Sequence, residues 1–194
     1  MSANSNVSHW KYSNLLNNQN NRFNKEEILK ILSAKDIDES YNTISKWKNY
    51  KPTPLILLNK LNEKLRLNKI FYKDESKRFG LKSFKALGGA YAVEKIIKNN
   101  DKKIISTATA GNHGRSVAWG SQKNNLECKI FISEFVSEAR AKVMRNFGAE
   151  VIRVKGNYEN SLDECIKLSR ENNLSVIYIC PLSFYSTYMK IRIL

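Results

Sequence analysis

The sequence predicts an α/β fold in which helices flank a parallel sheet, and two features of the chain carry that prediction. From Lys69 onward, short apolar runs alternate with amphipathic stretches, which is the pattern of βαβ units. The chain has 194 residues, of which 42% are hydrophobic and 26% are charged, a balance typical of a folded protein. That length allows one ordinary domain, or one small domain and part of a second.

The N-terminal third of the chain is less regular than the rest. Residues 1–22 are polar and rich in Asn and Ser, so we expect a flexible N-terminal arm. Residues 25–32 carry apolar side chains at helical spacing, which predicts a helix. Pro52 and Pro54 then impose an extended connection, and the apolar run 55–67 predicts a second helix.

The remaining elements alternate in type along the chain. The predicted strands cover residues 70–72, 103–107, 128–132, 151–154 and 175–179. The amphipathic stretches between them predict helices at residues 83–99, 112–123, 137–147 and 157–171. Gly148 directly follows the third of these helices, where a left-handed residue is expected to end it.

The charge of the chain narrows the classes of partner. The 33 basic and 18 acidic residues give a net charge of +15 at pH 7, which by itself is typical of proteins that bind nucleic acid, anionic lipid or polyphosphate. The lysines are scattered, and no compact basic block carries interleaved aromatic residues. We interpret the excess as charge on solvated faces, which leaves room for a modest attraction of anionic ligands, and we expect no nucleic-acid and no membrane partner.

The cysteines and the apolar runs indicate a compartment. Cys128, Cys165 and Cys180 form no CxxC pair, and His9 and His113 are the only histidines, so we expect neither a metal site nor a disulfide framework. No apolar run reaches membrane length, and the N-terminus lacks the apolar segment of a signal peptide. The sequence therefore favours a cytoplasmic protein.

Lys85 is the first candidate for chemistry. It follows Ser83 and Phe84 at the start of a predicted helix, and we interpret the cations before it (Lys73, Lys77, Arg78 and Lys82) as solvated. Apolar neighbours and nearby cations favour the neutral amine of a lysine, which can form a Schiff base with an aldehyde. The alternative is a lysine that extends from a partly buried helix face to water.

The second candidate is the turn at residues 106–115, which follows a predicted strand and opens a helix. Its small residues let a ligand approach the backbone, and free N–H groups at a helix N-terminus bind a carboxylate or phosphate. Asn112 adds a directional amide. The alternative is an ordinary turn in which Gly111 allows the bend and His113 is a partly exposed polar residue. No GxGxxG motif is present, so a dinucleotide site is not expected.

Together the two blocks suit a carbonyl cofactor that holds an amino acid. Residues 73–91 and 107–119 resemble fold type II pyridoxal phosphate (PLP) enzymes of the tryptophan synthase β-like superfamily, and within it the diaminopropionate ammonia-lyases. The resemblance runs from about residue 50 to about residue 179. It implies PLP as cofactor and a two-domain, usually dimeric carbon–nitrogen lyase of amino acid catabolism, which converts 2,3-diaminopropionate to pyruvate and ammonia.

The resemblance also implies roles for individual residues. Lys85 is the Schiff-base lysine, and Phe84 lies beneath the cofactor ring. Asn112 donates a hydrogen bond to the phenolic oxygen of the cofactor. The turn that holds the substrate carboxylate consists of Thr109, Ala110, Gly111, Asn112 and His113. In the implied reaction the substrate amine displaces Lys85, the cofactor ring delocalises the negative charge at Cα, and the β-amino group leaves.

Ala110 departs from the family pattern. The residue before Gly-Asn-His-Gly is typically an aspartate that acts as a base, and an alanine cannot accept a proton, so activity on D-substrates should suffer most. An alanine or serine at this position is more similar to the threonine and serine dehydratases, in which the lysine itself deprotonates Cα. A threonine/serine dehydratase-like PLP enzyme is therefore the alternative function.

The resemblance divides the chain into the N-terminal part of a large PLP domain at residues 23–84 and a small βαβ domain at residues 85–179. Residues 180–194 follow neither period, so we expect an aberrant C-terminal tail. The glycine-rich phosphate loop of the family is not found in the sequence. We expect a truncated chain that is weakly active or inactive, from a disrupted reading frame or a genuine short paralogue. A catalytically dead fragment that binds a full-length homologue is the further alternative.

Overall fold

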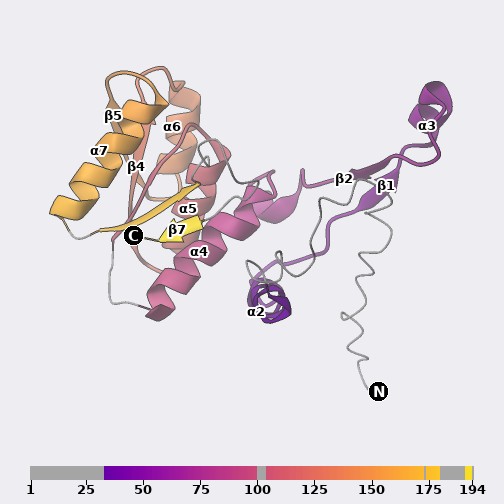
Figure 1. Cartoon of the computed structure of the whole chain (residues 1–194), viewed down its shortest axis with the longest axis horizontal. Coiled ribbons are helices and arrows are strands. Elements are labelled where there is room, and N and C mark those ends of the chain that lie inside the picture. The colour runs from indigo at the N-terminus through magenta and orange to yellow at the C-terminus, as the bar shows by residue number, and fades with distance from the viewer. Residues whose placement is uncertain (1–32, 100–103, 173, 180–190, 194) are drawn as a thin grey trace. The chain divides into compact units, whose positions relative to one another are not determined.

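The computed structural model describes residues 33–99, 104–172, 174–179 and 191–193. The chain divides into two compact units, residues 1–42 and 43–194, and each is described by itself. The arm expected at residues 1–22 and the helix expected at residues 25–32 lie outside the described residues, as do residues 180–190 and 194 of the expected tail. Figure 1 gives the element labels used below.

Helix α2 (Ala34–Ile44) begins in the first unit and was not predicted from the sequence. Ser33 and Asp36 form its N-terminal cap. The backbone N–H of Asp36 donates to the Ser33 hydroxyl at 3.2 Å, and the Asp36 carboxylate accepts from the Ser33 backbone N–H at 3.1 Å. This reciprocal arrangement satisfies two backbone donors at the start of the helix.

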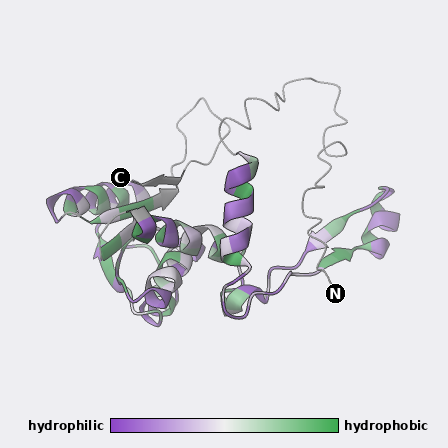
Figure 2. Cartoon of the chain, turned by 90° about the horizontal axis from the view of Figure 1, so that it is seen from below, coloured by the Kyte–Doolittle hydropathy of each residue, from purple (hydrophilic) through white to green (hydrophobic). Residues whose placement is uncertain are grey.

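A small hairpin follows in the second unit. Strand β1 (Leu55–Leu57) pairs antiparallel with β2 (Phe71–Lys73), and α3 (Asn59–Leu65) lies between them in the chain. The helix predicted over 55–67 is therefore wrong at its beginning, because the three residues after Pro54 gain a ladder of hydrogen bonds with β2. The hydrophobic colour of β1 in Figure 2 corresponds to exposed side chains, such as Leu55, which is 62% exposed.

The larger sheet confirms the predicted fold class. Its strand order is β5-β4-β3-β6-β7, in which β3 (Ile104–Ala108), β4 (Glu127–Ser133), β5 (Glu150–Val154) and β6 (Ser175–Ile179) run parallel. Strand β7 (Ile191–Ile193) adds an antiparallel edge beside β6. Each of the four parallel strands was predicted within one residue at either end. The predicted strand at residues 70–72 belongs instead to the separate hairpin.

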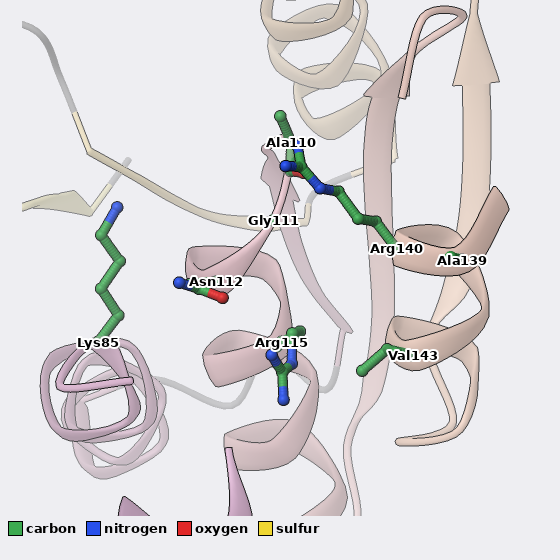
Figure 3. A pocket seen from close by; sticks show the side chains of 8 residues that line it. All are labelled: Lys85, Ala110, Gly111, Asn112, Arg115, Ala139, Arg140 and Val143. Atoms are coloured by element: carbon green, nitrogen blue, oxygen red, sulfur yellow. The ribbon is translucent and has the colours of Figure 1, made fainter. Parts of the chain in front are cut away.

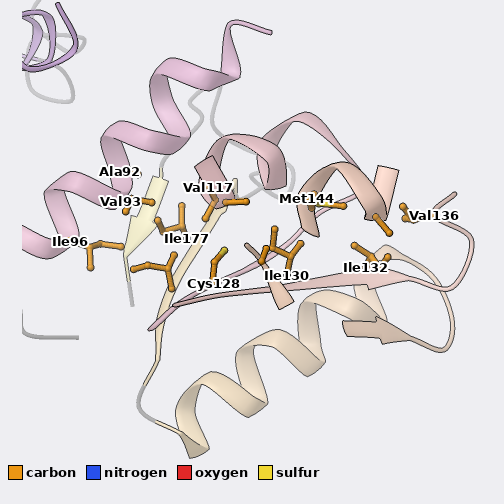
Figure 4. Packing of buried hydrophobic residues seen from close by; sticks show 14 residues of the cluster. Ala92, Val93, Ile96, Val117, Cys128, Ile130, Ile132, Val136, Met144 and Ile177 are labelled. Atoms are coloured by element: carbon orange, nitrogen blue, oxygen red, sulfur yellow. The ribbon is translucent and has the colours of Figure 1, made fainter. Parts of the chain in front are cut away.

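Four helices cover the two faces of the sheet; the first precedes β3, and the other three connect its parallel strands in turn. They are α4 (Lys85–Asn99), α5 (Asn112–Lys123), α6 (Glu138–Arg145) and α7 (Tyr158–Glu171). All four were predicted, with starts or ends shifted by up to two residues. Figure 4 shows α4, α5 and α6 on one side of the sheet and α7 on the other. No helix among the described residues is long and apolar enough to span a membrane.

Successive side chains of β4 point to opposite faces of the sheet, as the pleat of a strand requires. Cys128, Ile130 and Ile132 face the cluster formed with α4, α5 and α6 (Figure 4), whereas Phe131 belongs to a second cluster with residues of α7. Both faces of the parallel sheet are thus buried, which explains why its strands are short continuous apolar runs in the sequence.

Helices α4 and α5 pack closely because small residues lie between them. A Cβ placed on Gly89 of α4 would lie 2.3 Å from the Ser116 hydroxyl oxygen of α5. A Cβ placed on Gly120 of α5 would lie 2.7 Å from the Cα of Ala90. This close approach places the first residue of α4, Lys85, beside the N-terminal half of α5.

Candidate functional site

One pocket is lined by residues from both candidate regions of the sequence, the region of Lys85 and the turn at residues 106–115. Its volume is about 450 Å³, and it lies between the start of α4, the start of α5 and one side of α6. Figure 3 shows its lining, which consists of Lys85, Ala110, Gly111, Asn112, Arg115, Ala139, Arg140 and Val143. Four of the seven residues that the sequence assigns to the site are therefore brought together.

Lys85 is held by its backbone, and its side chain forms no hydrogen bond or ion pair among the described residues. Its backbone N–H donates to the Ser83 hydroxyl at 3.2 Å, and its carbonyl oxygen accepts from the Ser116 hydroxyl at 2.5 Å. The side chain is half-buried and extends along the edge of the pocket (Figure 3). A primary amine on a fixed backbone is suited to attack a carbonyl carbon delivered to the pocket.

The turn before α5 supplies the opposite wall. Gly111 is the residue before the helix, and Asn112 is its first residue, with a side chain that extends toward Lys85 in Figure 3. The first N–H groups of a helix have no partner within it, and they carry partial positive charge. This end of α5 can therefore bind a carboxylate or phosphate beside the lysine.

Three of the sequence-assigned residues do not line this pocket. Phe84 is 59% exposed and is not among the residues that line this pocket. Thr109 is buried, and its hydroxyl accepts from the Gly111 N–H at 3.3 Å, which shapes the turn.

His113 points into the protein rather than into the pocket. It is 6% exposed, and its Nε2 lies 3.5 Å from the Ile177 carbonyl oxygen. Burial lowers the pKa of His113 to about 4, and the nearby Lys85 charge acts in the same direction. The ring is therefore neutral at pH 7, and the sequence-based alternative of a partly exposed histidine is wrong.

The cationic side of the pocket was not predicted from the sequence. Lys85, Arg115 and Arg140 line it, and none of the eight lining residues is acidic. Arg140 donates to the Ala110 carbonyl oxygen at 3.3 Å, and the buried Nε of Arg115 has no acceptor among the described residues. Arg115 could have been found, since it lies one helical turn after Asn112. The α6 residues could not, because only the sheet order brings α6 beside α5.

In the loop before Lys85, the prediction that Arg78 is solvated is wrong. Its side chain is only 6% exposed. Its guanidinium donates to Glu75 at 2.7 Å, to the Thr53 hydroxyl at 2.9 Å and to the Lys51 carbonyl oxygen at 2.9 Å. The hydrogen bond from Arg78 lowers the pKa of Glu75 below its ordinary value. These bonds tie the extended segment around Pro52 to the loop that leads to Lys85.

The described residues contain no group of three potential metal ligands. A cationic pocket with one primary amine, one amide and a helix N-terminus is instead suited to an organic anion that carries a carbonyl group. Lys85 can react with the carbonyl carbon, and the surrounding donors can hold carboxylate or phosphate oxygens.

Comparison with known proteins agrees with this chemistry. Residues 46–186 match the family of pyridoxal-phosphate dependent enzymes. The chain is 31% identical over 175 residues to the diaminopropionate ammonia-lyase of Escherichia coli K12, an alignment that covers 81% of this chain and 44% of that enzyme. It is 30% identical over 151 residues to a biosynthetic L-threonine dehydratase of Staphylococcus epidermidis, covering 75% of this chain and 34% of the relative.

A solved structure shows the same fold. The crystal structure of Escherichia coli diaminopropionate ammonia-lyase, in complex with an aminoacrylate-PLP azomethine reaction intermediate, matches with a TM-score of 0.72 and 31% identity. The match covers 79% of this chain and 43% of that one. The chain therefore spans less than half the length of these relatives.

Proposed function

Because the chain belongs to the family of pyridoxal-phosphate dependent enzymes, we propose that it forms the lysine-bearing side of a site for β-elimination of ammonia from 2,3-diaminopropionate. With one water molecule, the products are pyruvate and two molecules of ammonia. The observation that carries the proposal is the pocket itself, in which Lys85 and Asn112 from the two sequence blocks lie on facing helices.

The described residues fit the cofactor at its aldehyde end. Lys85 offers a primary amine, and Asn112 offers an amide donor. A Cβ built on Gly111 would meet no atom within 4 Å, so the backbone of the turn is open to a ligand. When bound, PLP supplies an aldehyde carbon and a ring that withdraws electrons from the substrate Cα.

The residues of the chain then have separate tasks. Lys85 would hold the cofactor through Nζ, and the same nitrogen would accept the proton from the substrate Cα. Asn112 donates a hydrogen bond to a cofactor oxygen, and the N–H groups of the turn at residues 109–113 hold the substrate carboxylate. Arg115 and Arg140 attract the carboxylate of the substrate into the pocket.

A dehydratase is the second candidate, favoured by Ala110. Among the residues that line the pocket, only Lys85 has a side chain suited to remove a proton from Cα. The methyl group of Ala110 cannot accept a proton, and the arginines remain protonated. Elimination by a single lysine is what the sequence comparison with threonine and serine dehydratases implies. The same site would then release water from serine or threonine.

The activity of the chain by itself is proposed to be weak or absent. The support is that no glycine-rich phosphate loop is found in the sequence and that the chain spans 44% of the Escherichia coli relative. We also propose the homodimer that the family resemblance implies, which sedimentation velocity would test.

A product assay distinguishes these functions. The purified chain with PLP is given L- and D-diaminopropionate, L-serine and L-threonine, and the 2-oxo acid is measured with lactate dehydrogenase. We expect slow pyruvate formation, fastest from L-diaminopropionate, that is lost in Lys85→Ala and kept in the neighbouring control Lys82→Ala. Ala110→Asp should raise the rate with the D-isomer. Faster turnover of serine or threonine would favour the dehydratase, and an equal rate in Lys85→Ala would contradict both.

A further inference from the structure

We propose that a second pocket of the chain binds a small anion with two or more phosphate groups. This pocket has a volume of about 640 Å³ and shares no lining residue with the pocket beside Lys85. Its lining consists of Lys48, Asn49, Lys51, Lys77, Phe79, Gly80, Trp119 and Lys123. The proposal does not rest on the proposed function, because neither Lys85 nor PLP takes part in it.

The charge of this pocket is the first support. Four of its eight lining residues are lysines, and none is acidic. Lys123 is paired with Glu94 at 2.6 Å. The side chains of Lys48, Lys51 and Lys77 form no ion pair or hydrogen bond among the described residues, although the charge of Lys77 does act on Asp74. Like charges that converge on one cavity repel each other, and a bound polyanion removes that cost.

Two aromatic residues that line the pocket, Phe79 and Trp119, pack with the neighbouring Trp47, and this cluster is the second support. The rings of Phe79 and Trp119 lie 4.9 Å apart, and the ring of Trp47 lies 5.6 Å from that of Trp119. Lys123 Nζ lies 3.9 Å from the centre of the Trp47 ring. Trp47 is 7% exposed, and its Nε1–H is a buried donor without an acceptor among the described residues. A buried donor of this kind is normally satisfied.

The backbone around the pocket is the third support. Asn49 and Phe79 have φ angles of +66° and +48°, in the left-handed region that residues other than glycine rarely adopt, and Gly80 follows at +74°. Such conformations persist where the surrounding structure imposes them, and they concentrate at ligand sites. Asn49 lies in the segment before β1, whereas Phe79 and Gly80 lie in the segment before α4. Both segments line the same cavity.

Phosphate groups fit these features better than a single carboxylate does. Three unpaired ammonium groups need more negative charge than one carboxylate carries, and a phosphate accepts hydrogen bonds at several oxygens. The cavity is concave and of a size suited to a metabolite. Both free polyphosphate and a nucleoside polyphosphate present this chemistry, so the experiment must separate them.

The test is a titration of the purified full chain with sodium tripolyphosphate, ATP and adenosine at physiological salt, followed by calorimetry and by tryptophan fluorescence. We expect saturable 1:1 binding of tripolyphosphate with a change in fluorescence, since Trp119 lines the site and Trp47 packs against it. Tighter binding of ATP than of tripolyphosphate would identify a nucleotide site, and equal binding would identify a site for the phosphates alone.

Variants locate the binding. The triple variant Lys48→Gln, Lys51→Gln and Lys77→Gln should weaken binding about tenfold or more, because each exposed ion pair contributes modestly. The matched control replaces three exposed lysines elsewhere, Lys64, Lys98 and Lys167, so that net charge is equal. Lys77→Gln alone, at an exposed side chain, should weaken binding measurably without a risk to folding. No saturable binding, or equal weakening in the two triple variants, would overturn the proposal.

Discussion

The hydroxyl of Ser116 donates a hydrogen bond to the backbone carbonyl oxygen of Lys85, across 2.5 Å and between two helices. Ser116 is fully buried in α5, and Gly89 of α4 leaves the space for it. The bond fixes the first residue of α4 against the helix whose first turn carries Asn112. The lysine and the turn are thus held together by the packing of α4 on α5.

Replacement of Ser116 by alanine should remove this bond and lower stability by about 1 kcal/mol, because the carbonyl loses a buried partner. Urea unfolding measures the change. The control is Ser175→Ala, which removes a hydroxyl that is also fully buried but has no hydrogen-bond partner among the described residues. A loss of equal size in both variants would argue that the Ser116 bond contributes nothing specific.

Two adjacent glycines should respond in opposite ways to alanine. In Gly89→Ala the new Cβ would lie 2.3 Å from the Ser116 hydroxyl oxygen, so α4 and α5 must separate, at a cost of about 1–3 kcal/mol. In Gly88→Ala the new Cβ meets nothing within 4 Å, and the better helix former should stabilise by about 0.5–1 kcal/mol. Thermal unfolding of both variants measures the difference. Destabilisation by both would contradict the packing described.

The buried His113 should make stability depend on pH. Burial lowers its pKa from an ordinary 6.5 to about 4 in the folded state. Between these values the unfolded chain binds the proton and the folded chain does not, so stability falls as the pH falls from 6.5 toward 4, by up to about 1.4 kcal/mol per pH unit. Urea unfolding across this range, in a His9→Gln background, would show the slope. The slope should be smaller after His113→Gln, with a remainder near pH 4 from carboxyl groups such as Glu75, and an unchanged slope would assign it to other groups.

Two cysteines should be inert in the folded chain. Cys128 and Cys165 are buried, and burial raises the pKa of their thiols to about 12 and about 11. Because the thiolate is the reactive form, less than about a tenth of these thiols should react with an aromatic disulfide reagent at neutral pH. The measurement uses Cys180→Ser with and without denaturant. Rapid reaction without denaturant would show that the sheet opens readily.

Sequence patterns predicted the elements whose apolar spacing extends over several turns or over a whole buried strand. Helix α5 and strand β6 have the bounds expected for them. The hairpin was misjudged because Leu55–Leu57 is too short to show an alternating pattern, and its pairing partner lies beyond α3 in the chain. Helix α2 was missed because its composition is mostly polar and none of its residues is buried.

The residues of the candidate site also fall into two groups, those that local sequence could predict and those that it could not. Lys85, Gly111 and Asn112 could be selected from their local sequence, because a lysine among apolar residues and a glycine before a helix have chemical meaning without tertiary structure. Arg140 could not, since it reaches the Ala110 carbonyl oxygen only after β4 places α6 next to α5. Nor could the burial of Arg78, which depends on acceptors more than twenty residues earlier.

An absorbance spectrum of the purified chain with PLP, before and after borohydride reduction, tests the role of Lys85 most directly. We expect a band at about 420 nm, and reduction should fix the cofactor covalently to Lys85, as Schiff-base chemistry requires. Lys82→Ala should keep the band and Lys85→Ala should lose it. A band of equal strength in Lys85→Ala, or a label found on other lysines by peptide mapping, would contradict the assignment of the site.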